Sequence, residues 1–413
     1  MSRLKQIFRK TCLRPNYIVF LSIVILVPSK MGQLNKRALL ARLQVLGTAS
    51  RAELAKSLGL SQPTTGKIVD DLIRIGLVRE FDSNRLQEVA TLGRPGRQLR
   101  LDDSRPRLVA VQLGVTHTSL AALSIAGGGE DHWTVQFATP AGPGRWQRAL
   151  SKAAARLGGD GLWGVLASVP GVVDERTAKV LFSPNLHWTE GPGLIGLIRK
   201  VWNLPVALVQ EERALAMGHQ ASDPGQEDFL LTDFGDGVGG AAIIEGKIFS
   251  PPLPMSGEFG HTPVLGNKRP CGCGAVGCLE TMVSSSGLLR SFAAARRSGE
   301  ADWPALVRFI GTHGVVPWLA ETLDATAFAI AGALNVCGLR RVVVTGGLAE
   351  LPPTVLEYLS AAIERGALWA RWGRVEVQRA PRRRGAGLAA AGMERLVLPM
   401  IEGETEAVKF VKR

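Results

Sequence analysis

At 413 residues the chain is too long for one average domain, and 46% hydrophobic with 21% charged residues excludes an intrinsically disordered protein. The formal net charge of +13 is uneven, because residues 1–107 hold 20 Lys and Arg against 8 Asp and Glu. This excess favours a polyanionic partner for the first part of the chain, with a solvated basic tail as the alternative.

The first thirty residues resemble the start of a targeting segment. A basic stretch through Arg14 precedes an apolar run from Tyr17 to Val27, which is shorter than the ~20 residues that a bilayer span needs. No small-residue cleavage site follows this run. We therefore expect residues 1–30 to be an over-extended reading frame or a disordered leader before Met31. A membrane-anchored regulator is the alternative.

Residues 31–104 predict a winged helix-turn-helix. Leucines at helical spacing predict a first helix from Leu34 to Leu46, and Ser50 with Glu53 has the form of a capping box that opens a second. Gly59 ends the second helix, and Ser61 caps a third with Pro63 in its first turn. Two helices joined by such a short turn are typical of DNA-binding proteins. An ordinary helical hairpin is the alternative.

The third helix and the segment after it supply the predicted DNA contacts. In a helix-turn-helix, the N-terminal residues of the second helix touch base edges in the major groove. Two arginines in the Gly-Arg-Pro-Gly-Arg turn would contact the minor groove, or merely phosphates, as a β-wing. The predicted DNA-binding residues are Gln62, Thr64, Thr65, Lys67, Arg94 and Arg97.

Beyond an expected hinge at 105–107, residues 105–400 predict a duplicated α/β domain, followed by a tail at 401–413. A strand, a glycine turn and a second strand occur at 108–125 and again at 229–244. Such turns can hold phosphates through backbone N–H groups, although ordinary hairpins also use glycine. The repetition indicates two similar lobes with a cleft between them.

One histidine and three cysteines predict a metal site. Five cysteines, three of them within eight residues, argue against a disulfide framework and for a reducing, cytoplasmic compartment. The four ligands His261, Cys271, Cys273 and Cys278 suit tetrahedral zinc, and no open position is evident, so the zinc should be structural. Unligated thiols are the alternative. Glu258 and Glu280 stand beside these ligands, either to orient them or to accept hydroxyl groups.

These motifs resemble the ROK family of repressors, open reading frames and kinases. The most specific match is Gly-Glu-x-Gly-His followed by Cys-x-Cys-Gly-x-x-Gly-Cys-x-Glu, from Gly257 to Glu280. Further matches lie at Val169–Asp174, Asn185–Trp188, Thr345–Gly347 and Gly385–Gly387. The resemblance implies a two-lobed actin/hexokinase-like domain built from ribonuclease-H-like halves, behind a winged helix-turn-helix.

The resemblance also implies a sugar site. The family holds sugar hydroxyls with residues that correspond to Glu258, His261 and Glu280, and with an Asn-Asp pair that aligns with Gln210 and Glu211. His261 would then bind zinc through one nitrogen and face the sugar with the other. We expect no cationic partner for the three carboxylates.

Catalysis is where the chain departs from the family pattern. ROK kinases begin this domain with Asp-x-Gly-Gly-Thr, whose Asp serves Mg-ATP, whereas this chain has Gln112-Leu-Gly-Val-Thr116. The base position would be Glu211, longer by one methylene, and small misplacements can cost about 100-fold in rate. We therefore predict no kinase activity and no catalytic residue, with Glu211 as a vestigial base. An active ATP-dependent, glucokinase-like sugar kinase fused to a DNA-binding domain is the alternative, because Asp174, Glu211 and Asp236 remain.

The predicted function is that of a transcriptional repressor of carbohydrate-metabolism genes. Its partners would be double-stranded operator DNA and a sugar or sugar derivative. We expect no contact with a membrane. Because helix-turn-helix repressors read paired half-sites, a homodimer or tetramer is expected by analogy.

Overall fold

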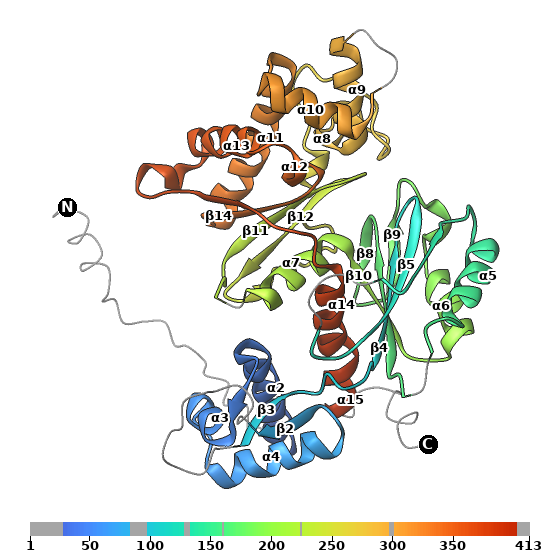
Figure 1. Cartoon of the computed structure of the whole chain (residues 1–413), viewed down its shortest axis with the longest axis vertical. Helices are drawn as coiled ribbons and strands as arrows, with labels where there is room; N and C mark the ends of the chain where they lie inside the picture. The colour runs from blue at the N-terminus through green and yellow to red at the C-terminus, as the bar shows by residue number, and fades with distance from the viewer. Residues whose placement is uncertain are drawn as a thin grey trace, which may run out of the picture.

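The computed structural model describes residues 28–82, 97–127, 133–158, 161–223, 225–296 and 301–402, which form an N-terminal module and two α/β lobes (Figure 1). Residues 1–27 of the predicted leader and 403–413 of the predicted tail lie outside this description. The first helix begins at Pro28, six residues before the expected start. Among the helices described, none combines the length and the apolar character that crossing a bilayer requires.

The N-terminal module packs three helices against a small antiparallel sheet in the order β1-β3-β2. The predicted capping box is confirmed, because Glu53 N donates to Ser50 Oγ and Ser50 N donates to Glu53 Oε2. Gly59 ends the second helix with φ of 64°, and Ser61 caps the third. The elements are α2 (Pro28–Leu46), β1 (Ala49–Ser50), α3 (Arg51–Leu58), α4 (Gln62–Arg74), β2 (Val78–Asp82) and β3 (Arg97–Leu101).

The first lobe is a five-stranded sheet in the order β10-β7-β4-β5-β6. The β4–β5–β6 part is antiparallel, whereas β7 and β10 join β4 in parallel. The elements of this lobe are β4 (Leu108–Leu113), β5 (His117–Leu123), β6 (Val135–Ala138), α5 (Pro143–Ala154), β7 (Gly164–Val169), β8 (Val172–Asp174), β9 (Lys179–Phe182), η2 (His187–Thr189), α6 (Gly193–Trp202) and β10 (Val206–Gln210).

The second lobe repeats the same strand order, β13-β12-β11-β14-β15, with the same parallel and antiparallel pairs, so the predicted duplication is confirmed. Its elements are β11 (Phe229–Phe234), β12 (Val238–Ile244), β13 (Lys247–Ile248), η3 (Phe259–His261), α8 (Glu280–Val283), α9 (Ser285–Arg296), α10 (Trp303–His313), α11 (Pro317–Cys337), β14 (Arg341–Gly346), α12 (Gly347–Glu350), α13 (Pro353–Gly366), η4 (Leu368–Arg371) and β15 (Glu376–Arg379).

Two helices lie between the lobes and contact each other closely: α7 (Glu211–Ser222) and α14 (Arg384–Gly392) (Figure 1). A Cβ at Gly387 would collide with the carbonyl oxygen of Ala214, and a Cβ at Gly218 with that of Arg383. The two helix backbones therefore touch without side chains between them. Because α7 also packs on β12 and α14 on β7, this pair joins the two sheets.

The chain continues from α14 through a π-helical turn, η5 (Met393–Val397), into α15 (Leu398–Glu402), which packs on α2 of the N-terminal module (Figure 1). Val397 and Leu398 belong to the same buried cluster as Leu39 and Leu43 of α2. Between the module and the first lobe, the expected hinge is packed, because the buried Arg107 lies over the Trp163 ring at 4.3 Å. The module thus shares its core with the lobe behind it.

Candidate functional site

A cavity of about 400 Å³ lies between the two lobes, where the sequence predicts a cleft. The glycine turns between β4 and β5 and between β11 and β12 face it, one from each lobe. All of the predicted sugar-site residues line it, namely Gln210, Glu211, Glu258, His261 and Glu280. Residues up to 70 positions apart in the sequence are therefore brought together around this cavity.

Gln210, Glu258 and His261 form one connected polar group in this cavity. Gln210 Nε2 donates to Glu258 Oε1 at 2.9 Å, and Glu258 Oε2 lies 3.7 Å from His261 Nε2. Burial raises the pKa of the Glu258 carboxyl, and the nearby charge of Glu280 raises it further. Glu280 Oε2 accepts from the Val238 N–H at 3.0 Å. This wall offers several oxygen acceptors close together, which is suited to a ligand rich in hydroxyl groups.

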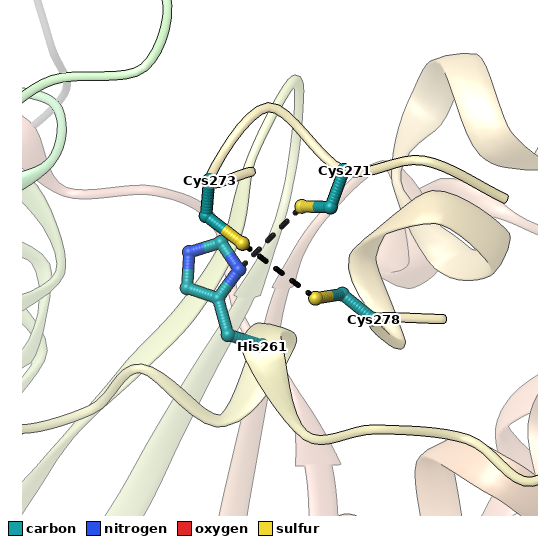
Figure 2. Close-up of side chains that lie close together, drawn as sticks. All are labelled: His261, Cys271, Cys273 and Cys278. Atoms are coloured by element: carbon teal, nitrogen blue, oxygen red, sulfur yellow. Dashed lines mark hydrogen bonds between the residues drawn. The ribbon is translucent and has the colours of Figure 1, made fainter. Parts of the chain in front are cut away.

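The predicted metal ligands converge beside the cavity, which His261 also lines. One ligand atom from each of His261, Cys271, Cys273 and Cys278 lies within 4.8 Å of all the others. Figure 2 shows the histidine ring and the three sulfurs pointing toward a common centre, with Cys271 Sγ 3.7 Å from His261 Nδ1. One imidazole and three thiolates are a donor set that zinc prefers, so these residues fit a zinc ion. The His261 ring faces the cysteine cluster with its Nδ1 atom and faces the Glu258 carboxylate with its Nε2 atom.

The thiols of this cluster differ in acidity. Burial raises the pKa of the Cys271 thiol to about 12, whereas the backbone N–H of Ala275 lowers the pKa of Cys273. Three sulfurs this close cannot all carry a negative charge unless a cation lies among them. A divalent metal would supply that charge, and binding it would release protons.

Glu211 has a cationic partner, so that part of the prediction is wrong. Its Oε1 accepts from Arg384 Nε at 2.8 Å and from Nη2 at 2.7 Å. Gln112 Nε2 lies 3.5 Å from the same oxygen. Arg384 begins α14 and reaches Glu211 only because α14 packs against α7, a contact that no local sequence pattern reveals.

The sequence analysis also missed an ion pair at the edge of the cavity. Arg382 donates through Nε to Asp233 Oδ1 at 2.7 Å and through Nη2 to Oδ2 at 2.8 Å. The guanidinium lies against both Gly235 and Gly346, where a Cβ at either position would collide with Nη2. It therefore fills the space between the β11–β12 turn and the end of β14. The basic run at 382–384 was the only signal in the sequence.

Glu212 is a second residue that sequence analysis did not select. Burial raises the pKa of its carboxyl well above the usual range, and the charge of Glu211 adds to this effect. Its Oε2 is buried without a hydrogen-bond partner, and the side chain packs against Gly239 of β12. Burial next to another carboxylate favours the protonated form of this residue.

Three of the six predicted DNA-binding residues lie on the surface of α4. Gln62, Thr64 and Lys67 are exposed, and the Thr64 hydroxyl lies 2.8 Å from Ser61 Oγ in the helix cap. Thr65 is fully buried on the opposite face, so the prediction that it contacts DNA is wrong for this arrangement of the module. Helical spacing alone left its face ambiguous at the first turn.

The predicted wing is described only at its base. Arg97 begins β3, and its Nη1 lies 3.2 Å from Glu80 Oε2. The Arg97 side chain is 69% exposed. Arg94 lies outside the described residues, and its predicted DNA contact stays a prediction.

Comparison with known proteins gives a consistent family. The family model described as ROK family matches residues 108–398. The xylose repressor of Caldicellulosiruptor bescii is 27% identical over 267 residues, covering 63% of this chain and 66% of that protein. The DNA-binding transcriptional dual regulator NagC of Escherichia coli is 24% identical over 371 residues, covering 81% and 86% of the two chains.

The chain is also similar to a kinase and to solved structures. A glucokinase of Halalkalibacterium halodurans is 28% identical over 286 residues, covering 63% of this chain and 86% of that protein. The crystal structure of a ROK family transcriptional regulator, a homolog of the E. coli MLC protein, superposes with a TM-score of 0.70 at 20% identity. That match covers 91% of this chain and all of the other. At this identity the likeness establishes the fold.

We predict that Cys273→Ser lowers bound zinc from about one equivalent to less than about 0.1 per chain and lowers Tm by about 10 °C, because ligation energy contributes to folding. Elemental analysis and calorimetry would measure both. Cys337→Ser is the matched control, since Cys337 lies on α11 outside the cluster and should change neither value. Wild-type protein purified without chelator that holds no metal would refute the prediction.

Proposed function

The chain belongs to the ROK family, and on that premise we propose that it is a DNA-binding transcriptional repressor of carbohydrate-metabolism genes, controlled by a sugar or sugar derivative. In this proposal the N-terminal module is a winged helix-turn-helix, the cavity between the lobes binds the sugar, and zinc is structural. The protein acts in the cytoplasm on double-stranded operator DNA, as a homodimer or tetramer.

One observation carries the proposal: the segment from Arg384 to Glu402 runs from the cavity to the N-terminal module. At its start, Arg384 holds Glu211 on the cavity wall. At its end, α15 packs on α2. A ligand that changes the relative position of the two lobes would act on both ends of this segment. A stand-alone sugar kinase would have no use for such a connection.

The cavity supports a sugar as the ligand. Glu258 and Glu280 present carboxylate oxygens beside Gln210 and His261, and a site built to bond hydroxyl groups rejects analogues that lack them. The loop that carries Glu258, His261 and Glu280 is the one that the proposed zinc would hold. A structural role for the metal therefore fits its position beside the ligand.

An active kinase is the alternative, and the phosphate-facing side of the cavity weighs against it. Gln112, an amide, stands where the family's kinases have an acidic residue, and Arg382 occupies the space beside Gly235 and Gly346. Phosphoryl transfer depends on a positioned metal ion, and the neutral amide of Gln112 is a weaker metal ligand than a carboxylate. The glucokinase relatives keep the alternative testable: ADP release with any sugar, in a coupled assay, would favour it.

The contacts around Glu175 suggest how a sugar could affect DNA binding. Glu175 is nearly buried; its Oε1 accepts from the Gln210 N–H at 2.9 Å, and its Oε2 pairs with Arg213 and Arg395. Gln210 reaches Glu258 in the cavity, and Arg395 lies on η5, the π-helical turn before α15. Turns of this kind inside helices occur often at functional positions. Glu175 thus lies between the cavity and the segment that contacts the module.

We predict that Lys67→Ala weakens binding to a selected operator and lowers the slope of log affinity against log salt by about one, because one phosphate contact is lost. Gln62→Ala should instead reduce base discrimination by about 1–3 kcal/mol at one or two positions. Fluorescence anisotropy across a salt series would measure both. Lys152→Ala, exposed on α5, is the control. Unchanged binding in both variants would contradict the role of α4.

We expect Glu258→Ala to lower sugar affinity by about 100-fold and to remove the sugar effect on DNA binding, because the bound hydroxyl groups lose an acceptor. Calorimetry with a sugar panel, followed by operator binding with the sugar identified, would measure this. Glu364→Ala, exposed on α13, serves as the control, and zinc content should stay unchanged in both. A full sugar response in Glu258→Ala would contradict the assigned site.

For Glu175→Gln we predict sugar affinity within about threefold of wild type but a sugar effect on DNA affinity reduced about tenfold, a loss of about 1.4 kcal/mol of coupling. The substitution keeps an acceptor for Gln210 N and removes the charge that holds Arg395. Glu394→Gln is the matched control, because Glu394 is exposed on η5 next to Arg395. If Glu175→Gln responds to sugar as wild type does, the proposed connection does not run through Glu175.

A further inference from the structure

Three polar side chains lie side by side across the first-lobe sheet and face the cavity between the lobes. Gln112 on β4 is the register partner of Ser119 on β5, and Ser119 is the register partner of Gln136 on β6. All three line the cavity. Register partners on adjacent strands project from the same face of a sheet, with about 4.8 Å between the strands. Gln112, Ser119 and Gln136 thus form a polar row along this side of the cavity.

The opposite face of the same three strands is apolar. Val111, Leu120 and Val135 each stand next to a member of the polar row, and all three belong to the buried core of the first lobe. Because successive side chains of a strand point to opposite faces, burial of these neighbours turns the polar row toward the cavity. The orientation of the row is therefore set by the core of the lobe.

The polar row has hydrogen-bonding capacity that the described residues leave unused. Ser119 is only 3% exposed, and its hydroxyl has no hydrogen-bond partner among the described residues. The Gln136 side chain is exposed to the cavity, and Gln112 makes one long contact, 3.5 Å from its Nε2 to Glu211 Oε1. Because a buried hydroxyl without a partner lowers stability, Ser119 indicates a partner that comes from the cavity.

The polar row lies beyond the residues to which the proposed function assigns the sugar. Those residues run from Glu258 through Gln210 to Glu211, and Gln112 contacts Glu211 from the side of the first-lobe sheet. Gln136 lies two strands farther along, about 10 Å from Gln112 across the sheet. A sugar ring held by Glu258 therefore leaves the polar row to a further part of the ligand.

The size of the cavity leaves room for such a ligand. Its volume of about 400 Å³ falls within the range of about 300–1,000 Å³ that is typical of sites for drug-sized molecules. A single hexose is smaller than such molecules, whereas a disaccharide is comparable to them. The volume therefore favours a ligand with more than one ring.

The chemistry of the polar row favours hydroxyl groups over phosphate. Two amides and a hydroxyl carry no charge, and each of them can both donate and accept hydrogen bonds. A phosphate is bound most strongly by cations, and the arginines that line the cavity, Arg382 and Arg384, are already paired with carboxylates. A sugar hydroxyl donates and accepts at the same oxygen, which is what uncharged groups of this kind can match.

We propose that the polar row is a second sugar subsite, so that the effector is a disaccharide or a longer glycoside. One ring lies at Glu258 and Glu280, and the next ring lies over the polar row, where Ser119 and Gln136 bond its hydroxyl groups. Such a ligand touches both lobes, since the row belongs to the first lobe and Glu280 begins α8 of the second. This inference rests on the proposed function, because it takes the cavity to be a sugar site.

Calorimetry on the full chain tests the proposal by comparing monosaccharides with their own disaccharides. The panel pairs glucose with maltose and cellobiose, xylose with xylobiose, and N-acetylglucosamine with di-N-acetylchitobiose. We expect one disaccharide to bind at least about tenfold more tightly than its monosaccharide, because the second ring adds hydrogen bonds. Gln136→Ala and Ser119→Ala should each weaken that disaccharide about fivefold and its monosaccharide less than about twofold. Gln147→Ala is the control, since Gln147 lies on α5 of the same lobe, outside the described lining of the cavity.

The possible results separate this proposal from the proposed function. Unchanged melting temperatures would show that the variants fold. Equal affinity for a monosaccharide and its disaccharides, or a disaccharide affinity that neither variant changes, would overturn the second subsite and leave the sugar site standing. Binding of ATP that Gln136→Ala weakens would overturn the second subsite as well, because it would assign the polar row to a nucleotide. If no sugar of the panel binds, the proposed function itself fails.

Discussion

The close packing of α7 against α14 is the constraint on which the rest of the structure depends. Because Gly218 and Gly387 have no side chains, the two helix backbones approach until carbonyl oxygens fill the space that a Cβ would need. Glu211 begins α7 directly after Gln210 ends β10, and Arg384 begins α14, so this contact brings all three residues to the cavity. The same contact fixes the direction in which the chain leaves toward α15 and the N-terminal module.

Electrostatics then divide the cavity into two parts. On one side Glu258 accepts from the Gln210 amide and Glu280 from the Val238 N–H, and burial holds the Glu258 carboxyl at a raised pKa. On the other side the carboxylates are neutralised, Glu211 by Arg384 and Asp233 by Arg382. The cavity therefore has carboxylates bonded to neutral donors at one end and ion pairs with arginine at the other. This asymmetry suits recognition of a neutral polyhydroxyl compound better than transfer of a phosphoryl group.

The cysteine loop and the C-terminal segment are held in place by different interactions. In the loop from Glu258 to Glu280, Leu265 and Val276 are exposed, and convergence of His261 with three thiols gives the loop a centre that a metal can hold. The segment after α14 instead shares a buried cluster with α2, so the module is not tethered by a loose linker. Arg107 stacks on the Trp163 ring and so packs the connection between the module and the first lobe.

The sequence by itself determined what depends on neighbours along the chain: the Ser50 capping box, the ends of α3 and α4, the strand–turn–strand repeat of the two lobes, and the histidine and cysteines of the metal cluster. These follow from local hydrogen bonds, helical and strand periods, and ligand spacing. Only the tertiary structure decided which charges pair, because Glu211–Arg384 and Glu175–Arg395 join residues more than 170 positions apart. It also decided that Thr65 faces the core. Periodicity identifies a buried face, but packing between distant segments determines what that face meets.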